Sequence, residues 1–142
     1  MTLDLDTART IVAAARDHGR RGDLKALTVV VLDAGGHVVA AEREDGASIK
    51  RFEIAFGKAH GALALGMGSR ALMARAEQQA YFITAAASAA GGALVPVPGG
   101  VLILDQDDAT VGAVGISGDT SDADEAACIA GISAAGFTPK VD

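Results

Sequence analysis

Two pairs of β-rich segments, each joined by a short polar turn, constrain the fold of this chain more than any other feature. Residues 26–33 ("ALTVVVLD") and 37–44 ("HVVAAERE") flank the turn "AGG", and residues 101–105 and 110–117 flank the turn "QDDA". Valine, isoleucine and threonine are frequent in these segments, as is typical of strands. Connections this short join antiparallel strands, because parallel neighbours need a long crossover. We therefore predict two β-hairpins within an antiparallel sheet.

Apolar residues at helical spacing predict two helices, one before and one after the first hairpin in the sequence. The first helix is expected to be capped by Thr2. Its buried stripe is expected to comprise Leu5, Ala8, Ile11, Val12 and Ala15. The stripe of the next helix is expected to comprise Phe52, Ala55, Phe56, Ala59 and Leu63.

Capping signals predict the remaining helices. Ser69 precedes a helix expected from residue 70 to about residue 88, and Ser121 with Asp124 resembles a capping box at the start of the last helix. That last helix is expected to end near Gly136. The order is then helix, two strands, two helices, two or three strands and a helix, which predicts an α+β fold. The chain, with 142 residues, has the length of one domain, 1–142.

Composition argues against several classes of function. The net charge of −6 opposes binding to nucleic-acid phosphates, and an aromatic content of 4% provides no platform for stacking single strands. The one cysteine, Cys128, excludes an internal disulfide, and its apolar neighbours predict a buried, inert thiol. No apolar run reaches the roughly 18 residues of a membrane span, and the acidic start does not resemble a signal peptide. We therefore expect a cytoplasmic protein without nucleic-acid or membrane partners.

The three histidines are scattered along the chain, so no pair has metal-ligand spacing. His18 ends the first helix, where a positive charge suits the helix dipole, and His37 begins a strand beside a glycine turn. His60 is flanked by Gly57 and Gly61, which lie one helical turn apart. The two missing side chains leave room either for a flat ligand or for the close packing of another helix or subunit.

Two glycine-bearing loops are candidates for the borders of one cleft. Residues 98–100 ("PGG") form a rigid turn that permits close approach of the backbone, and residues 117–120 lead into the last helix. Three carboxylates at the start of that helix favour capping over anion binding. Ligand contact through Ser117, Gly118 or Thr120 stays open as the alternative.

Four segments resemble the GlcG/HbpS-like family of haem-binding proteins, a module that also forms the C-terminal domain of PduO-type cobalamin adenosyltransferases. These segments are "VVVLDAGGHVVAAEREDGA", "AFGKAHGA", "PGGVLI" and "VGAVGISGDTSDADEAACIAG". The resemblance implies a profilin-like α+β domain, in which helices flank an antiparallel sheet of about five strands. It also implies homo-oligomers, often octamers, and haem binding, which in some members is linked to iron handling or haem breakdown. Lys58, Asp124 and Glu125 match the family's "KA" and "DE" positions.

Our leading hypothesis is a non-catalytic protein that binds a small molecule, with haem as the ligand and a link to haem or iron handling. The candidate cofactor-binding residues are His60, His18, His37, Gly99, Gly100, Ser117 and Gly118. His60 is the preferred iron ligand, because imidazole commonly ligates haem iron.

Two other hypotheses remain open. The first is an enzyme acting on a small organic substrate in a catabolic pathway, with its site between the 98–100 and 117–120 loops and Glu53, Lys58 or His60 as acid–base candidates. The second is an accessory protein whose oligomer surface is its function. Small side chains that allow close approach between chains predict an even-numbered homo-oligomer. They are Gly57, Gly61, Ala62 and Ala64.

Overall fold

Both predicted hairpins are present in the computed structural model, which describes residues 2–142. Strand β1 (Thr28–Asp33) pairs antiparallel with β2 (Val38–Arg43), and β3 (Gly100–Leu104) pairs antiparallel with β4 (Thr110–Ser117). The first hairpin is shorter than expected at its outer ends, and β3 begins one residue earlier. The β-rich segments and their short turns therefore predicted the pairing correctly and the strand ends only approximately.

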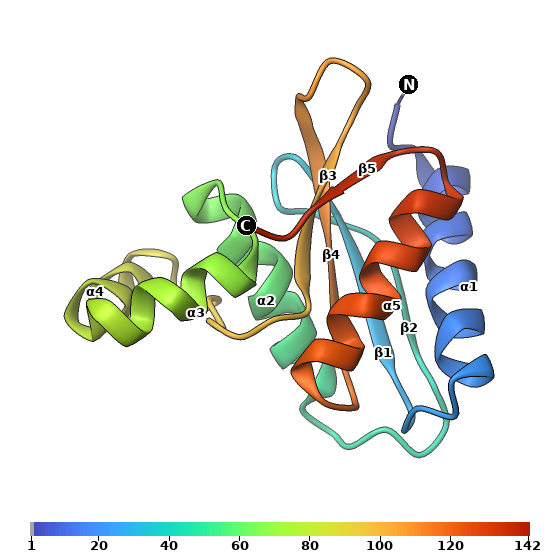
Figure 1. The fold of residues 1–142 in the computed structure, drawn as a ribbon, viewed down its shortest axis with the longest axis horizontal. Helices are drawn as coiled ribbons and strands as arrows, with labels where there is room; N and C mark the ends of the chain where they lie inside the picture. The colour runs from blue at the N-terminus through green and yellow to red at the C-terminus, as the bar shows by residue number, and fades with distance from the viewer. Residues whose placement is uncertain (1) are drawn as a thin grey trace.

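The described residues form an α+β fold of the profilin-like type, with a five-stranded antiparallel sheet in the order β2-β1-β4-β3-β5, where β5 is Thr138–Lys140. Helices α1 (Leu5–Arg21) and α5 (Ser121–Ala134) lie side by side on one face of this sheet, and α2 (Arg51–Leu65) covers the other (Figure 1). Helices α3 (Ser69–Gln78) and α4 (Ala80–Ala89) extend away from the sheet beyond α2 (Figure 1). Side chains from alternate strand positions fill the two resulting apolar layers.

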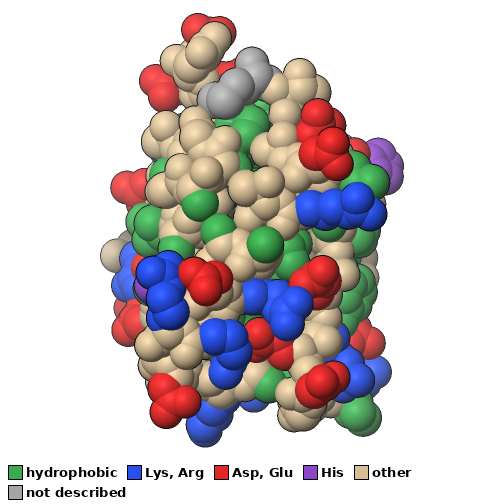
Figure 2. Space-filling model, turned by 90° about the vertical axis from the view of Figure 1, so that its right-hand side faces the viewer, with side chains coloured by type: hydrophobic (Ala, Val, Ile, Leu, Met, Phe, Trp, Pro, Cys, Tyr) green, Lys and Arg blue, Asp and Glu red, His purple; other side chains and the backbone are tan. Residues whose placement is uncertain are grey.

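Charged side chains of both signs interleave on the face that carries α1 and α5 (Figure 2). Arg16 on α1 pairs with Glu42 on β2 at 2.6 Å, and also with the carboxylate of Glu44 at 3.2 Å. Glu44 is buried and additionally accepts a hydrogen bond from the backbone N–H of Leu27 at 2.7 Å. These contacts hold α1 against the edge of the sheet.

Two helix caps differ from the sequence-based expectation. Helix α1 is capped by Asp4, whose carboxylate accepts from the backbone N–H of Thr7 at 2.8 Å, so Thr2 is not the cap. Helix α5 is capped by Thr120 rather than Ser121, because the Thr120 hydroxyl accepts from the backbone N–H of Ala123. Asp124 therefore does not complete a capping box, and its carboxylate is directed into the protein.

The helix expected from residue 70 to 88 is divided in two. Gln79 has φ −141° and ψ 67°, which interrupts the helix, and Ser69 is the first residue of α3 rather than its cap. No glycine or proline marks this break. Arg75 donates to the side chain of Gln79 at 2.6 Å and lies 4.1 Å over the ring of Phe82, so contacts between the two helices fix the bend. Strand β5 (Thr138–Lys140), which follows the last helix, was not expected there.

Within residues 2–142, none of the helices combines the length and apolar character that crossing a membrane requires.

Candidate functional site

His60 lies on the third turn of α2, and its ring is held in place by two contacts. The Nδ1 atom is 2.9 Å from the carbonyl oxygen of Ala93, and the ring stacks on Phe56 with 5.3 Å between centroids. A carbonyl oxygen only accepts hydrogen bonds, so Nδ1 carries the proton in the neutral ring. The Nε2 atom of His60 is then left with a lone pair that can bind a metal ion or accept a proton.

A hollow of about 140 Å³ adjoins His60 on the side of the β1–β2 turn. Gly36 in this turn has φ +82°, a left-handed conformation that favours glycine. A Cβ atom on Gly36 would lie 3.3 Å from Cδ2 of His60, so the bare backbone also leaves space beside the ring. The hollow is lined by Ala34, Gly35, Gly36, His60, Leu63 and Ala64.

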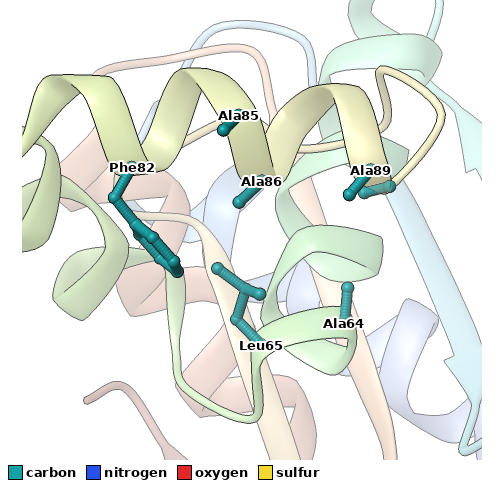
Figure 3. Close-up of a pocket in the computed structure, with 7 residues that line it drawn as sticks. Ala64, Leu65, Phe82, Ala85, Ala86 and Ala89 are labelled. Carbon is teal, nitrogen blue, oxygen red and sulfur yellow. The ribbon is translucent and has the colours of Figure 1, made fainter.

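A larger apolar hollow of about 430 Å³ lies between the end of α2 and α4 (Figure 3). Phe82 points from α4 towards Leu65 of α2 (Figure 3). The alanines of α4 form one wall of the hollow, and the end of α2 forms the wall that faces them (Figure 3). Its lining residues are Ala64, Leu65, Phe82, Ala85, Ala86, Ala89 and Ala90. Ala64 borders both hollows, so apolar surface continues from the neighbourhood of His60 to α4.

The other two histidines lie in different surroundings. His37 is exposed, and its Nδ1 is 3.2 Å from Asp33, at the edge of an open hollow that Leu3 and Val111 also line. A hydrogen bond from the backbone N–H of His37, with a second from that of Gly35, lowers the pKa of the Asp33 carboxyl. His18 is half-buried in the last turn of α1, as its position in the sequence predicts.

Gly57 and Gly61 do not leave room for a ligand or for a second helix. A Cβ atom on Gly57 would lie 2.7 Å from Val95, and one on Gly61 would lie 2.9 Å from Leu94. The loop that follows α4 fills the space, and the backbone N–H of Val95 donates to the carbonyl of Gly57. Both explanations considered for these glycines are therefore wrong, because the chain's own loop packs there.

Lys58 and Asp124 occupy the space between the 98–100 and 117–120 loops. The Lys58 side chain is 2% exposed, and its Nζ lies 2.9 Å from the carbonyl of Ile116 and 3.3 Å from the Asp124 carboxylate. Asp124 also accepts from the backbone N–H of Asp119 at 2.9 Å. Burial penalises the carboxylate and raises the pKa of Asp124 despite these partners. Gly99 packs directly against the Lys58 amine, so this pair joins the two loops.

The three acid–base candidates do not converge. Residues on a helix are separated by about 100° each, which places Lys58 and His60 on opposite sides of α2. Glu53 is exposed at the start of the same helix, where it lies 3.5 Å from Lys50. Over residues 2–142, no group of three or more His, Cys, Asp or Glu side chains has the arrangement of a metal site.

Cys128 is buried, as predicted, and its Sγ lies 3.4 Å from the carbonyl of Gly99. Burial raises the pKa of this thiol far above its ordinary value, so the reactive thiolate is suppressed.

Two features near the candidate site were not found from the sequence. The Ala93 carbonyl orients His60 across 33 residues of chain, and the apolar wall on α4 depends on the bend at Gln79. The sequence does contain an indication of the apolar wall on α4, because residues 80–89 contain no charged side chain.

Comparison with known structures confirms the fold. A crystal structure of a PduOC:haem complex superposes with a TM-score of 0.85 at 23% identity, covering 96% of this chain and 97% of the other. The protein ORFY of Klebsiella pneumoniae gives a TM-score of 0.84 at 22% identity, covering 96% and 92% of the two chains. A double mutant of HbpS from Streptomyces reticuli gives 0.79 at 24% identity, covering 94% and 86%. No curated protein sequence matches the chain significantly.

The sequence itself matches a family model over residues 3–133. That model, HbpS-like, is described as "Haem degrading protein HbpS-like". The match covers nearly the whole chain and includes both hairpins, α2 and most of α5. The chain therefore belongs to the HbpS-like family.

Proposed function

We propose that this protein binds haem, whose iron Nε2 of His60 would ligate. The observation that carries the proposal is the fixed orientation of this ring, since the Ala93 carbonyl engages Nδ1 and leaves Nε2 as the coordinating atom. Membership of the HbpS-like family and the likeness to a PduOC:haem complex support the choice of haem.

The surroundings of His60 suit a flat apolar ligand. Gly36 leaves one side of the imidazole uncovered by a side chain, and Leu63 and Ala64 extend an apolar surface from it. These residues would hold the porphyrin, while Phe56 and the Ala93 carbonyl would keep the imidazole in place. Haem would supply an iron atom that can bind a further small ligand or exchange an electron.

Titration of the apoprotein with hemin is expected to give a saturable Soret shift at one site per chain. His60→Ala is expected to weaken binding by at least about 10- to 100-fold, the loss usual when a group that only supports a metal ligand is changed, because here the ligand itself is removed. The matched controls are His18→Ala and His37→Ala, which should bind hemin as the parent does. Imidazole added to the His60→Ala protein should restore part of the Soret shift.

Two results would contradict this assignment. If His60→Ala binds as the parent does, the ligand is another residue, and exposed Tyr81 or a methionine would be tested next. If the parent gives no saturable shift, haem binding itself is wrong. Circular dichroism of each variant separates loss of the ligand from loss of the fold.

We also propose that the protein forms an even-numbered homo-oligomer, with an octamer as the expected form. Helix α4 carries no charged residue, and its Tyr81 is 74% exposed. This helix therefore offers apolar surface for contact with another chain. Light scattering is expected to give an even multiple of the 14.2 kDa chain mass. A 14.2 kDa species that persists at tens of micromolar would contradict the proposal.

A further inference from the structure

A row of polar side chains crosses the sheet beneath the first turn of α2. In the strand register, Thr28 of β1 lies opposite Arg43 of β2 and opposite Ser117 of β4. Side chains of directly paired residues project from the same face of a sheet. Ser117 projects towards α2, because its hydroxyl accepts from the Arg51 guanidinium at 3.0 Å. Arg43, Thr28 and Ser117 therefore share the α2 face.

Thr28 has a buried hydroxyl that lacks a hydrogen-bond partner in residues 2–142. The residue is 1% exposed, and its Oγ1 atom is the single buried side-chain oxygen or nitrogen there without a partner. An unpaired buried hydroxyl is costly, and native proteins contain few of them. Since Thr28 is paired with Ser117, its side chain is the neighbour on β1 of the side chain that accepts from Arg51.

The local charges favour an anion. Helix α2 has 15 residues, and within residues 2–142 its N-cap, Lys50, makes no side-chain capping hydrogen bond. The N-terminal end of the helix, which is the positive end of its dipole, carries Arg51 and therefore lies at this site. Arg43 donates to the carbonyl of Ala47 and Arg51 donates to hydroxyls, and neither pairs with a carboxylate in residues 2–142. Glu53, the nearest acidic residue on α2, is exposed and lies against Lys50.

We propose that these groups form a binding site for a small oxyanion, a phosphate or carboxylate group of a ligand. Arg51 would supply paired N–H donors, Ser117 and Thr28 hydroxyl donors, and the first turn of α2 backbone N–H groups. Exposed Ser48, which accepts from Arg51 at 3.1 Å, and exposed Arg43 lie on the solvent side of the site. His60 is nine residues further along α2, about 14 Å away, so this site is separate from that of the proposed haem.

Inorganic phosphate is the first probe, with thermal unfolding as the readout. Sodium phosphate is expected to raise the Tm of the parent above that in sodium chloride of equal ionic strength, because a ligand of the native state stabilises it. Thr28→Val keeps the shape of the side chain and removes the hydroxyl, and Arg51→Gln removes the charge. Each is expected to raise the Kd for phosphate about tenfold or more.

Arg9→Gln, at an exposed position on α1, is the matched control and should keep the phosphate response of the parent. A parallel titration with acetate identifies which oxyanion is preferred, and a response to either supports the site. Equal Tm values in phosphate, acetate and chloride would overturn it, and so would a Thr28→Val protein that responds as the parent does. Arg51→Gln should still bind hemin, so failure of this proposal is distinguishable from failure of the haem proposal.

Discussion

Replacing Lys58 by methionine is expected to lower the free energy of unfolding by about 3–5 kcal/mol, because it leaves the buried Asp124 carboxylate without its cation. Asp124 is 1% exposed, and the pKa of its carboxyl is already raised by burial. The Ile116 carbonyl loses its side-chain donor as well. A loss of this size is a large part of the stability of an ordinary domain. Urea unfolding of parent and variant measures it.

The double variant Lys58→Met/Asp124→Leu is the informative control. Buried ion pairs often contribute little net stability, since the cost of removing two charges from water offsets their attraction. We therefore expect the double variant to recover most of the stability that Lys58→Met loses. A single variant as stable as the parent would show that Asp124 does not need the Lys58 amine.

Replacing Gly115 by alanine is expected to cost about 3 kcal/mol, the upper end of the usual range for overpacking. Gly115 lies in β4 directly beneath α2, and a Cβ atom there would overlap the backbone carbonyl of Ala55. A backbone group cannot rotate away as a side chain can, so α2 would have to move off the sheet. Because α2 carries His60, hemin affinity should fall together with the Tm.

Gly22→Ala serves as the matched glycine control. Gly22 has φ −88°, which any residue adopts, and an added Cβ would lie 3.4 Å from its nearest neighbour, the His18 carbonyl. Its effect on stability should stay within about 0.5 kcal/mol. If Gly115→Ala changes stability no more than Gly22→Ala does, the close approach of α2 to β4 is not required.

The sequence determined the features that depend on neighbouring residues. Segments rich in valine, isoleucine and leucine around the short turns at 34–36 and 106–109 set both hairpins, because connections this short join antiparallel strands. The apolar stripe of α1 also depends only on the spacing of nearby residues. Four of its five residues are buried, and Leu5 is 47% exposed. Residues that match the family's segments also indicate the profilin-like fold from the sequence alone.

The tertiary structure alone decided how the candidate site is built. The loop that fills the space at Gly57 and Gly61 comes from more than 30 residues later in the chain. Lys58 looked like an acid–base candidate, yet contacts with Ile116 and Asp124 place its amine in the core. The partner of His60, and the lack of a partner for the Thr28 hydroxyl within residues 2–142, likewise depend on which segments fold against them. Periodicity and spacing carry information only about nearby residues, whereas burial and hydrogen-bond partners are set by segments that meet across the sheet.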